Sequence, residues 1–161
     1  EIGTGDWSSD VCSSDLMKEL EKADANVPNI LKQDGVSHSV FDKANQEITH
    51  IPDLIKNYGQ GSSWSHTLVD TESNSATLIC QLPGEGNRKH YHPDWNEWWY
   101  IVSGTWEWDI EGEKKVIKQG DLVFMKKNRK HKITAIGDDV AIRIAVSKYD
   151  VDHVYENKDY L

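Results

Sequence analysis

Two histidines and a glutamate lie close together in KHYHPDWNEWWY, the segment that spans residues 89–100. Side chains two positions apart on a β-strand point to the same face, so His90 and His92 would project side by side. The letters PDWN favour a tight turn, after which Glu97 would begin a returning strand opposite the histidines. Two imidazoles and a carboxylate suit a divalent transition metal, whereas surface histidines beside a turn are the alternative interpretation.

The elements that must position these residues are short strands that begin at Trp64. Turn signals separate the strand-like segments WSHTLV, ATLICQL, RKHYH, EWWYIV, TWEWDI, KVIK, LVFM, HKITAI and VAIRIAV. Strands at this spacing, with no long helix between them, predict an all-β antiparallel sandwich or barrel. Because the chain has no second set of strands, we expect a single barrel rather than an internal repeat.

The glycine spacing around the histidines resembles the two motifs of the cupin superfamily. The first motif is Gly84, five residues, His90-Tyr91-His92, four residues, Glu97, six residues and Gly104. The second begins at Gly120 and ends in KKNRKH, fifteen residues separating the two motifs. The resemblance implies a small cupin β-barrel (a double-stranded β-helix, or jelly roll) with His90, His92, Glu97 and His131 as metal ligands. Glu97 is also the predicted catalytic residue.

The second motif departs from the family pattern at three positions. Lys126, Asn128 and Ala135 replace the usual proline, glycine and late asparagine. Asparagine enters left-handed backbone conformations more readily than most other residues, so Asn128 is a tolerable replacement for glycine. None of the three replacements affects a predicted ligand.

The remaining chain divides by composition into an arm, a barrel and a tail. Asp6 to Leu16 is what DNA resembling a common sequencing-library adapter would encode, so we expect residues 1–16 to be an artefact and the natural protein to start at Met17. Residues 17–60 form a partly helical N-terminal arm, 61–147 the barrel and 148–161 a C-terminal tail. In the arm, MKELEKA has a helix-forming composition, Pro28 and Gly35 interrupt the residues after it, and PDLIKNY suits a short helix.

Two residues outside the ligand set are predicted to line a substrate pocket. Trp99 shares the inward face of its strand with Glu97, and simple core packing is the alternative. Arg143 alternates with isoleucines, so it would bind a substrate carboxylate if its face is the barrel interior, and be exposed otherwise. We expect His38, His50, His66 and His153 to be ordinary surface or core histidines. A tail that covers the barrel mouth is conceivable, but a frayed terminus is the favoured interpretation.

Composition limits the partners. The net charge of −9, or −5 without residues 1–16, disfavours sequence-independent binding to nucleic acid. No apolar run approaches the roughly 20 residues of a membrane span, and two cysteines make no disulfide framework. We therefore expect a cytoplasmic protein with a small-molecule substrate and no nucleic-acid or membrane partner. Trp98 and Tyr100 on the outward face would pack under the arm or against a second subunit of a homodimer.

An open metal site supports three functional hypotheses. The first is an oxidoreductase of the dioxygenase type, with Fe(II) favoured, acting on a small oxygenated organic substrate. The second is a non-redox isomerase or lyase, and the third a module that binds or senses a small ligand. The second needs a general base, and the lyase form of it is weakened by Trp99, which stands where some cupin lyases carry a tyrosine. Mn(II), Ni(II), Co(II) and Zn(II) suit the same ligands.

Overall fold

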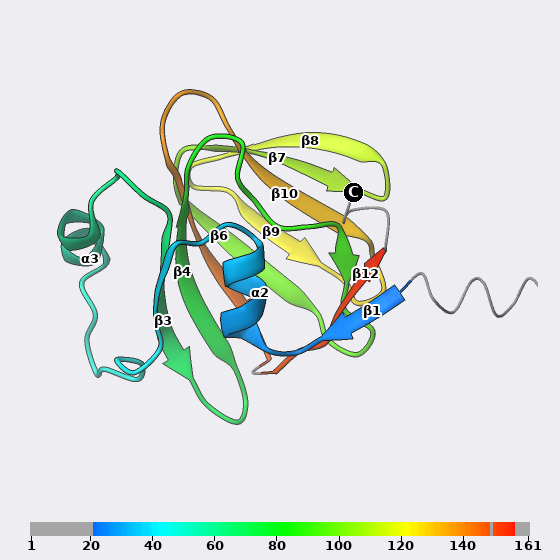
Figure 1. The fold of residues 1–161 in the computed structure, drawn as a ribbon, viewed down its shortest axis with the longest axis horizontal. Coiled ribbons are helices and arrows are strands. Elements are labelled where there is room, and N and C mark those ends of the chain that lie inside the picture. The colour runs from blue at the N-terminus through cyan, green and yellow to red at the C-terminus, as the bar shows by residue number, and fades with distance from the viewer. Residues whose placement is uncertain (1–20, 149, 157–161) are drawn as a thin grey trace, which may run out of the picture.

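Two six-stranded β-sheets face each other and enclose the core (Figure 1). The computed structural model describes residues 21–148 and 150–156. In sheet order the first sheet consists of β1 (Glu21–Asp24), β12 (His153–Glu156), β5 (His90–Tyr91), β10 (His131–Ile136), β7 (Thr105–Ile110) and β8 (Glu113–Lys118). The second consists of β2 (His38–Val40), β3 (Trp64–Asp70), β4 (Ser75–Gln81), β11 (Ala141–Ser147), β6 (Glu97–Ser103) and β9 (Leu122–Met125). The predicted all-β architecture is confirmed.

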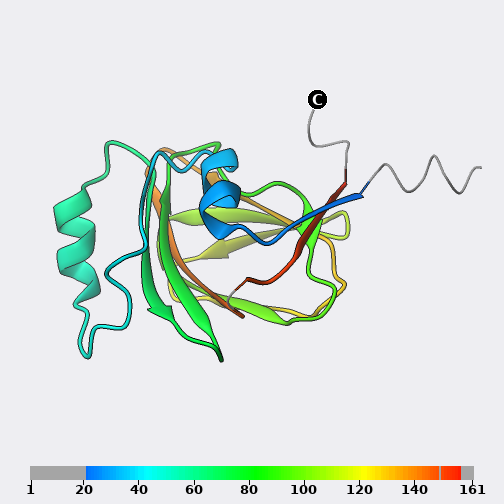
Figure 2. The same ribbon diagram turned by 60° about the horizontal axis from the view of Figure 1, so that its bottom comes forward.

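Pairing is antiparallel with one exception, the parallel pair of β2 and β3. The strands of the barrel expected over residues 61–147 all pair antiparallel, as predicted, and the parallel partner β2 belongs to the arm. The sheets also extend beyond residues 61–147, because β1 and β2 come from the arm and β12 from the tail. β1 and β12 run side by side at one end of the molecule (Figure 2).

Alternation along the central strands builds the core. Trp106 and Trp108 on β7 are fully buried, as is Ile133 on the paired strand β10. On β6 the odd-numbered residues Trp99 and Ile101 join this cluster, while the even-numbered ones point outward. Large apolar side chains at every second position hold the two sheets together and leave the polar ligands at one end of the barrel.

The arm differs from its prediction in two places. Residues 21–23 of the helix-forming segment belong to strand β1, because pairing with β12 outweighs the weak helical propensity. A helix, α2 (Val27–Gln33), then forms where Pro28 had suggested an interruption. Proline in the first turn costs no hydrogen bond, and the side chain of Asn26 caps the helix by accepting from the Asn29 amide at 2.9 Å. Ile30 and Leu31 anchor α2 in the core.

The second helix, α3 (Ile51–Tyr58), confirms the short helix expected over PDLIKNY. It lies outside the second sheet, against the face formed by β3 and β4 (Figure 1). Its apolar residues Leu54 and Ile55 pack against a buried cluster that includes Trp64 and Leu78. No helix of the described part of the chain is long and apolar enough to cross a membrane.

Candidate metal centre

The four predicted ligands converge from both sheets. His90 on β5 is the direct cross-strand neighbour of His131 on β10, and His92 lies two residues after His90. Glu97 begins β6 in the opposite sheet. All four are buried, with relative exposures of 2% for His90, 2% for His92, 7% for Glu97 and 0% for His131. Four polar groups buried together need partners, which a metal ion would provide.

The spacing of the ligand atoms fits one ion. One nitrogen or oxygen from each of the four residues lies within 4.8 Å of every other. Ligands at about 2.0–2.2 Å from a shared ion are at most about 4.4 Å apart. Small side-chain adjustments would therefore bring all four into coordination distance.

Backbone carbonyls orient the three imidazoles. The Nδ1 atoms of His90, His92 and His131 lie 2.8, 2.8 and 3.0 Å from the carbonyl oxygens of Arg88, Asp152 and Arg129. A carbonyl oxygen only accepts hydrogen bonds, so each Nδ1 carries a proton and each Nε2 faces the cluster. The Nε2 atoms of His90 and His131 are buried without a hydrogen-bond partner. Orphaned lone pairs of this kind, held by hydrogen bonds on the far side of the ring, are typical of metal ligands.

His92 and Glu97 form an ion pair. Nε2 of His92 lies 2.7 Å from Oε2 of Glu97. Burial alone would lower the pKa of His92, but the carboxylate of Glu97 outweighs it and raises that pKa. Burial likewise would raise the pKa of Glu97, but the charge and hydrogen bond of His92 lower it. In the metal-free protein this proton holds the pair together.

The other two predicted ligand histidines, His90 and His131, are neutral imidazoles. Burial, together with the nearby histidines, holds the pKa of His90 well below its usual range. Burial also lowers the pKa of His131 to about 4, although Glu97 opposes the shift. Both rings therefore present lone pairs at neutral pH without having to lose a proton.

His153 is the site residue that sequence reasoning missed. Its ring stacks on His90 at a centroid distance of 4.7 Å and meets His92 edge-on at 4.5 Å. Its Nδ1 lies 2.9 Å from the carbonyl oxygen of Val151, so Nε2 carries the lone pair. The expectation of a frayed tail is wrong at these residues, because β12 pairs with β5 and brings His153 to the predicted ligands. The alternation in VDHVYE was the one available signal for this strand.

A small cavity of about 70 Å³ adjoins the ligands. Its wall includes His90, Glu97 and His153, and both predicted pocket residues, Trp99 and Arg143. Helix α2 covers one side with Ile30 and Leu31, and its C-cap residue Asp34 lies beside them. The arm and the tail therefore complete a pocket that the central strands alone would leave open.

Arg143 faces the barrel interior, whereas the alternation along its strand had left open whether it was interior or exposed. Its relative exposure is 3%, and its guanidinium lies 4.4 Å above the ring of Trp106. Nη1 donates a hydrogen bond to Oε1 of Gln81 at 2.5 Å. The exposed alternative is excluded.

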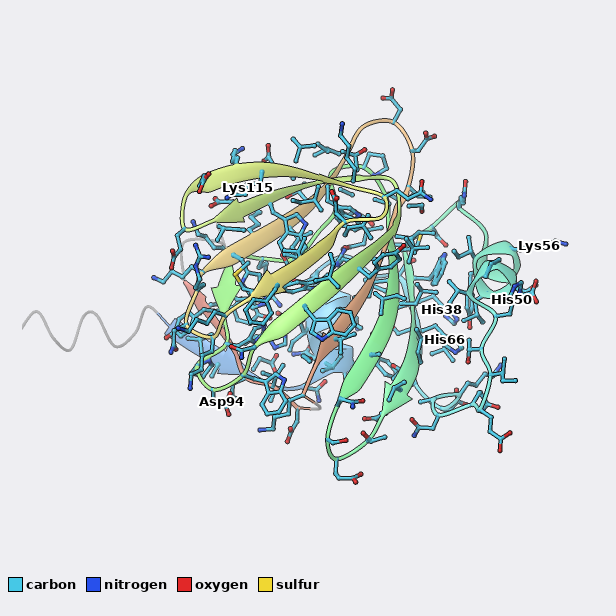
Figure 3. The ribbon with its side chains drawn as sticks, turned by 180° about the vertical axis from the view of Figure 1, so that it is seen from behind. His38, His50, Lys56, His66, Asp94 and Lys115 are labelled. Atoms are coloured by element: carbon cyan, nitrogen blue, oxygen red, sulfur yellow. The ribbon has the colours of Figure 1, made fainter. Side chains whose placement is uncertain are left out.

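Three histidines lie apart from the ligand cluster. His38, His50 and His66 are on the side of the second sheet near α3 (Figure 3). His66 is buried and its Nδ1 lies 2.8 Å from the hydroxyl of Tyr58. These three have the structural or surface roles expected for them.

The loop of the second motif keeps its backbone shape without glycine. Asn128 has a φ of 65°, the left-handed conformation predicted for it. Its amide donates to the carbonyl oxygen of His92 at 2.8 Å, which ties the loop to the ligand strand. Lys126 and Lys127 on this loop are exposed, in agreement with a solvated turn.

Comparison with known proteins identifies the fold. Residues 77–147 match the family described as Cupin domain. This region is a cupin domain. The match begins within β4 and ends with β11, so it includes all four clustered residues but not His153 or helix α2.

Two of the similar proteins have enzymatic names, and a third is uncharacterized. The sequence is 26% identical over 105 residues to polyketide synthase CurC from Streptomyces cyaneus, covering 63% of this chain and 68% of that protein. The fold is similar to the polyketide cyclase RemF from Streptomyces resistomycificus, with a TM-score of 0.57, 15% identity, and coverage of 70% of this chain and 85% of that one. An uncharacterized conserved protein with a double-stranded beta-helix domain from Klebsiella pneumoniae also reaches 0.57, at 19% identity and coverage of 70% and 92%. At these identities the two solved structures establish the fold alone.

Proposed function

We propose that this cupin is a metal-dependent enzyme that moves protons on a small oxygenated organic substrate. The observation that carries the proposal is His153, whose unprotonated Nε2 belongs to a ring packed on two ligand histidines at the wall of the same cavity. A Lewis acid beside a proton acceptor is the arrangement that isomerases, lyases and cyclases of carbonyl compounds require.

His90, His92, Glu97 and His131 would hold the ion. A divalent ion bound there supplies polarisation of a substrate oxygen, since four protein ligands leave one or two positions free. The residues do not discriminate among Fe(II), Mn(II), Co(II), Ni(II) and Zn(II). His153 would accept the proton of a carbon next to the polarised oxygen, and its Nδ1 hydrogen bond to Val151 would fix the orientation of the ring.

His153 also answers the objection to non-redox chemistry that came from the sequence. Trp99 offers no acid–base group at the position where some cupin lyases carry a tyrosine, and its indole packs instead on Trp108, at a centroid distance of 4.5 Å. His153 provides the missing group from the tail. This favours the non-redox alternative over the dioxygenase interpretation.

The sequence relative supports a carbonyl-rich substrate. The similarity to a protein named polyketide synthase extends over 105 residues. Polyketide chains carry carbonyl groups whose neighbouring carbons lose protons readily, which is the chemistry that the site would serve. With a cavity of about 70 Å³, only one end of such a chain would enter.

A dioxygenase is the second candidate. Two histidines and a carboxylate around an ion with open positions are also the ligands of non-heme Fe(II) oxygenases. His90, His92 and Glu97 provide this set, and His131 adds a fourth ligand. The same protein loaded with Fe(II) would then consume dioxygen in the presence of its substrate.

Hydrogen exchange and oxygen uptake discriminate between these functions. We would incubate Zn(II)- and Fe(II)-loaded protein with hydroxy ketones and 3-oxo thioesters in deuterated water, and follow C–H exchange by NMR and dioxygen with an electrode. The proposal predicts metal-dependent exchange that His153→Gln lowers at least 100-fold at unchanged metal content. His38→Gln, on the other side of the second sheet, is the matched control. Oxygen consumption without exchange would favour the dioxygenase, and binding with neither activity would leave a ligand-binding module.

A further inference from the structure

Arg143 is a buried cation that has no ion-pair partner among the described residues. It projects into the interior from β11, between Ile79 of β4 and Ile101 of β6 in the cross-strand register. Only 3% of the residue is exposed. Taking a guanidinium out of water costs free energy unless a charge or several hydrogen bonds compensate.

The compensation provided by the protein is incomplete. Nη1 donates to the neutral amide of Gln81, and the Trp106 ring covers one face of the guanidinium. Nε is buried without a hydrogen-bond partner. Among the described residues no carboxylate lies within ion-pair distance of Arg143. A cation–π contact and one hydrogen bond satisfy only part of a five-donor group.

The nearest acidic side chains are engaged elsewhere. Asp34 on the adjacent wall accepts from Nε of Arg88 at 2.7 Å, and Glu97 is paired with His92. Burial lowers the pKa of Arg143 to about 10, while the charges of Asp34 and Glu97 oppose the shift, so the guanidinium stays charged at neutral pH. The positive charge of Arg143, which has no carboxylate partner, therefore lies at the wall of a cavity.

That cavity joins Arg143 to the candidate metal centre. Arg143, His90 and Glu97 line one cavity, together with the polar side chains of Asn87 and Ser147. A ligand oxygen with negative charge would supply what the guanidinium lacks, and the planar fork of arginine suits the two oxygens of a carboxylate.

We propose that the cavity binds a small organic anion, with its carboxylate or enolate oxygen on Arg143 and a second oxygen directed at the His90–His92–Glu97–His131 cluster. The placement of the second oxygen rests on the proposed metal-dependent function. The anion site at Arg143 does not, because it is inferred from the guanidinium and its missing partner alone. Substrates of this class are short oxo or hydroxy carboxylates, or the acidic end of a longer chain.

The alternative is that Arg143 has a structural role only, with its guanidinium packed on Trp106. Carboxylates and their corresponding amides, tested on the wild-type protein, distinguish an anion-binding role of Arg143 from a structural one. We would measure by calorimetry the binding of lactate and lactamide, pyruvate and pyruvamide, and malonate and malonamide, to metal-free and to Zn(II)-loaded protein. Each pair has similar shape and differs in charge, so a structural Arg143 predicts equal affinities.

The expected result is at least tenfold tighter binding of each carboxylate than of its amide, also without metal. Arg143→Met should abolish this preference and Arg143→Lys should weaken it, because lysine keeps the charge but not the fork. Lys115→Met is the control: it removes one exposed positive charge on β8, away from the cavity (Figure 3). Equal affinities in the wild type, or an unchanged preference in folded Arg143→Met, would overturn the inference. If carboxylates are preferred but no exchange activity is found with any metal, the anion site stands and the proposed function fails.

Discussion

Nε2 of His92 and Oε2 of Glu97 lie 2.7 Å apart, in a cluster where the other two imidazole nitrogens have no partner. Because Nδ1 of His92 also donates to the carbonyl oxygen of Asp152, the ring is held between two acceptors and carries two protons. An ion bound at this site must replace the proton on Nε2. A metal ion that binds here would therefore take the place of the shared proton between His92 and Glu97.

Metal uptake should release a proton from His92. Its pKa is raised above the usual value of 6.5, so the ring stays protonated to a higher pH than a free histidine. The ion requires the neutral ring, so its affinity should fall as the pH drops below the pKa of His92 and level off above it. Calorimetry at about pH 6.5 in buffers of different ionisation enthalpy should show up to one proton released per ion. No dependence on the buffer would contradict this assignment.

Removing a ligand should empty the site, whereas changing the residue between the two histidines should not. Replacing hydrogen-bond partners of metal ligands commonly costs 10- to 100-fold in affinity, so His131→Ala should lose about 100-fold or more. Tyr91→Phe is the matched control, since Tyr91 lies on β5 with its side chain on the other face from His90 and His92. Metal per chain, measured by elemental analysis after dialysis, checks the prediction. Equal metal content in the two variants would exclude His131 as a ligand.

The site could be predicted from sequence where its geometry is local. A strand period of two and a short turn bring His90, His92 and Glu97 together within eight residues. Their spacing in the sequence is therefore enough to predict that these three side chains converge. His131 required the family resemblance, because the pairing of β5 with β10 joins positions 41 residues apart. The structure places all four side chains in one cluster.

The other features of the pocket could not be predicted from the sequence, because they depend on which strands pair and which sheet face is buried. Arg143 lies on an alternating strand, and alternation defines two faces without saying which is interior. His153 is brought to the site by β12, which pairs with β5 across more than 60 positions. Helix α2 was obscured by Pro28, which stops a helix only when it stands beyond the first turn. Residues 1–16, expected to be an artefact, lie outside the described residues.

Gly86→Ala should destabilise the fold. A Cβ at this position would meet the carbonyl oxygen of Ile133 and lie 2.9 Å from the Cα of Thr134, both backbone atoms of β10. Overpacking against backbone should lower the free energy of unfolding by about 3 kcal/mol and Tm by roughly 6–12 °C. Gly61→Ala, where nothing lies within 4 Å of the new Cβ, is the control. Thermal unfolding of the two variants should separate them, and equal Tm values would refute the clash.

The homodimer expected from the sequence has a candidate surface on β6 and β9. Trp98 pairs with Phe124 and Tyr100 with Leu122 across the two strands, and all four are exposed by 38–62%. Helix α3 covers the β3–β4 half of this sheet face and leaves the β6–β9 half bare (Figure 1). Contiguous apolar surface on a sheet edge marks an interface.

We predict that this edge pairs with a second copy of the chain, because opposite charges would then face each other. If β9 pairs antiparallel with its own copy about a twofold axis between Val123 and Phe124, Asp121 lies opposite Lys126 of the second copy. Light scattering should give twice the chain mass of 18.4 kDa. Asp121→Lys should yield monomers and Asp121→Lys with Lys126→Asp should restore the dimer, while Val116→Asp on β8 should change nothing. A monomeric wild type would refute the prediction.

Glu97→Gln separates the two proposed chemistries. The substitution keeps the shape of the side chain but removes the only negative charge among the four clustered residues. Metal affinity should fall at least tenfold, because a neutral amide is a weaker ligand than a carboxylate. Excess metal restores occupancy, so activity is compared at matched metal content, measured on the same samples.

At matched occupancy, the proton-transfer function predicts that Glu97→Gln keeps hydrogen-exchange activity within about tenfold of the wild type. His153, the proton acceptor, is intact in this variant, and an ion with less donated charge polarises a substrate oxygen at least as well. An oxygen-dependent enzyme would respond in the opposite way, because the charge donated by Glu97 keeps the ion reducing, so its turnover should nearly vanish. His153→Gln should show the reverse pattern, with exchange lost and metal content unchanged. Should Glu97→Gln abolish exchange as completely as His153→Gln does, Glu97 itself would be the proton acceptor and the role assigned to His153 would be wrong.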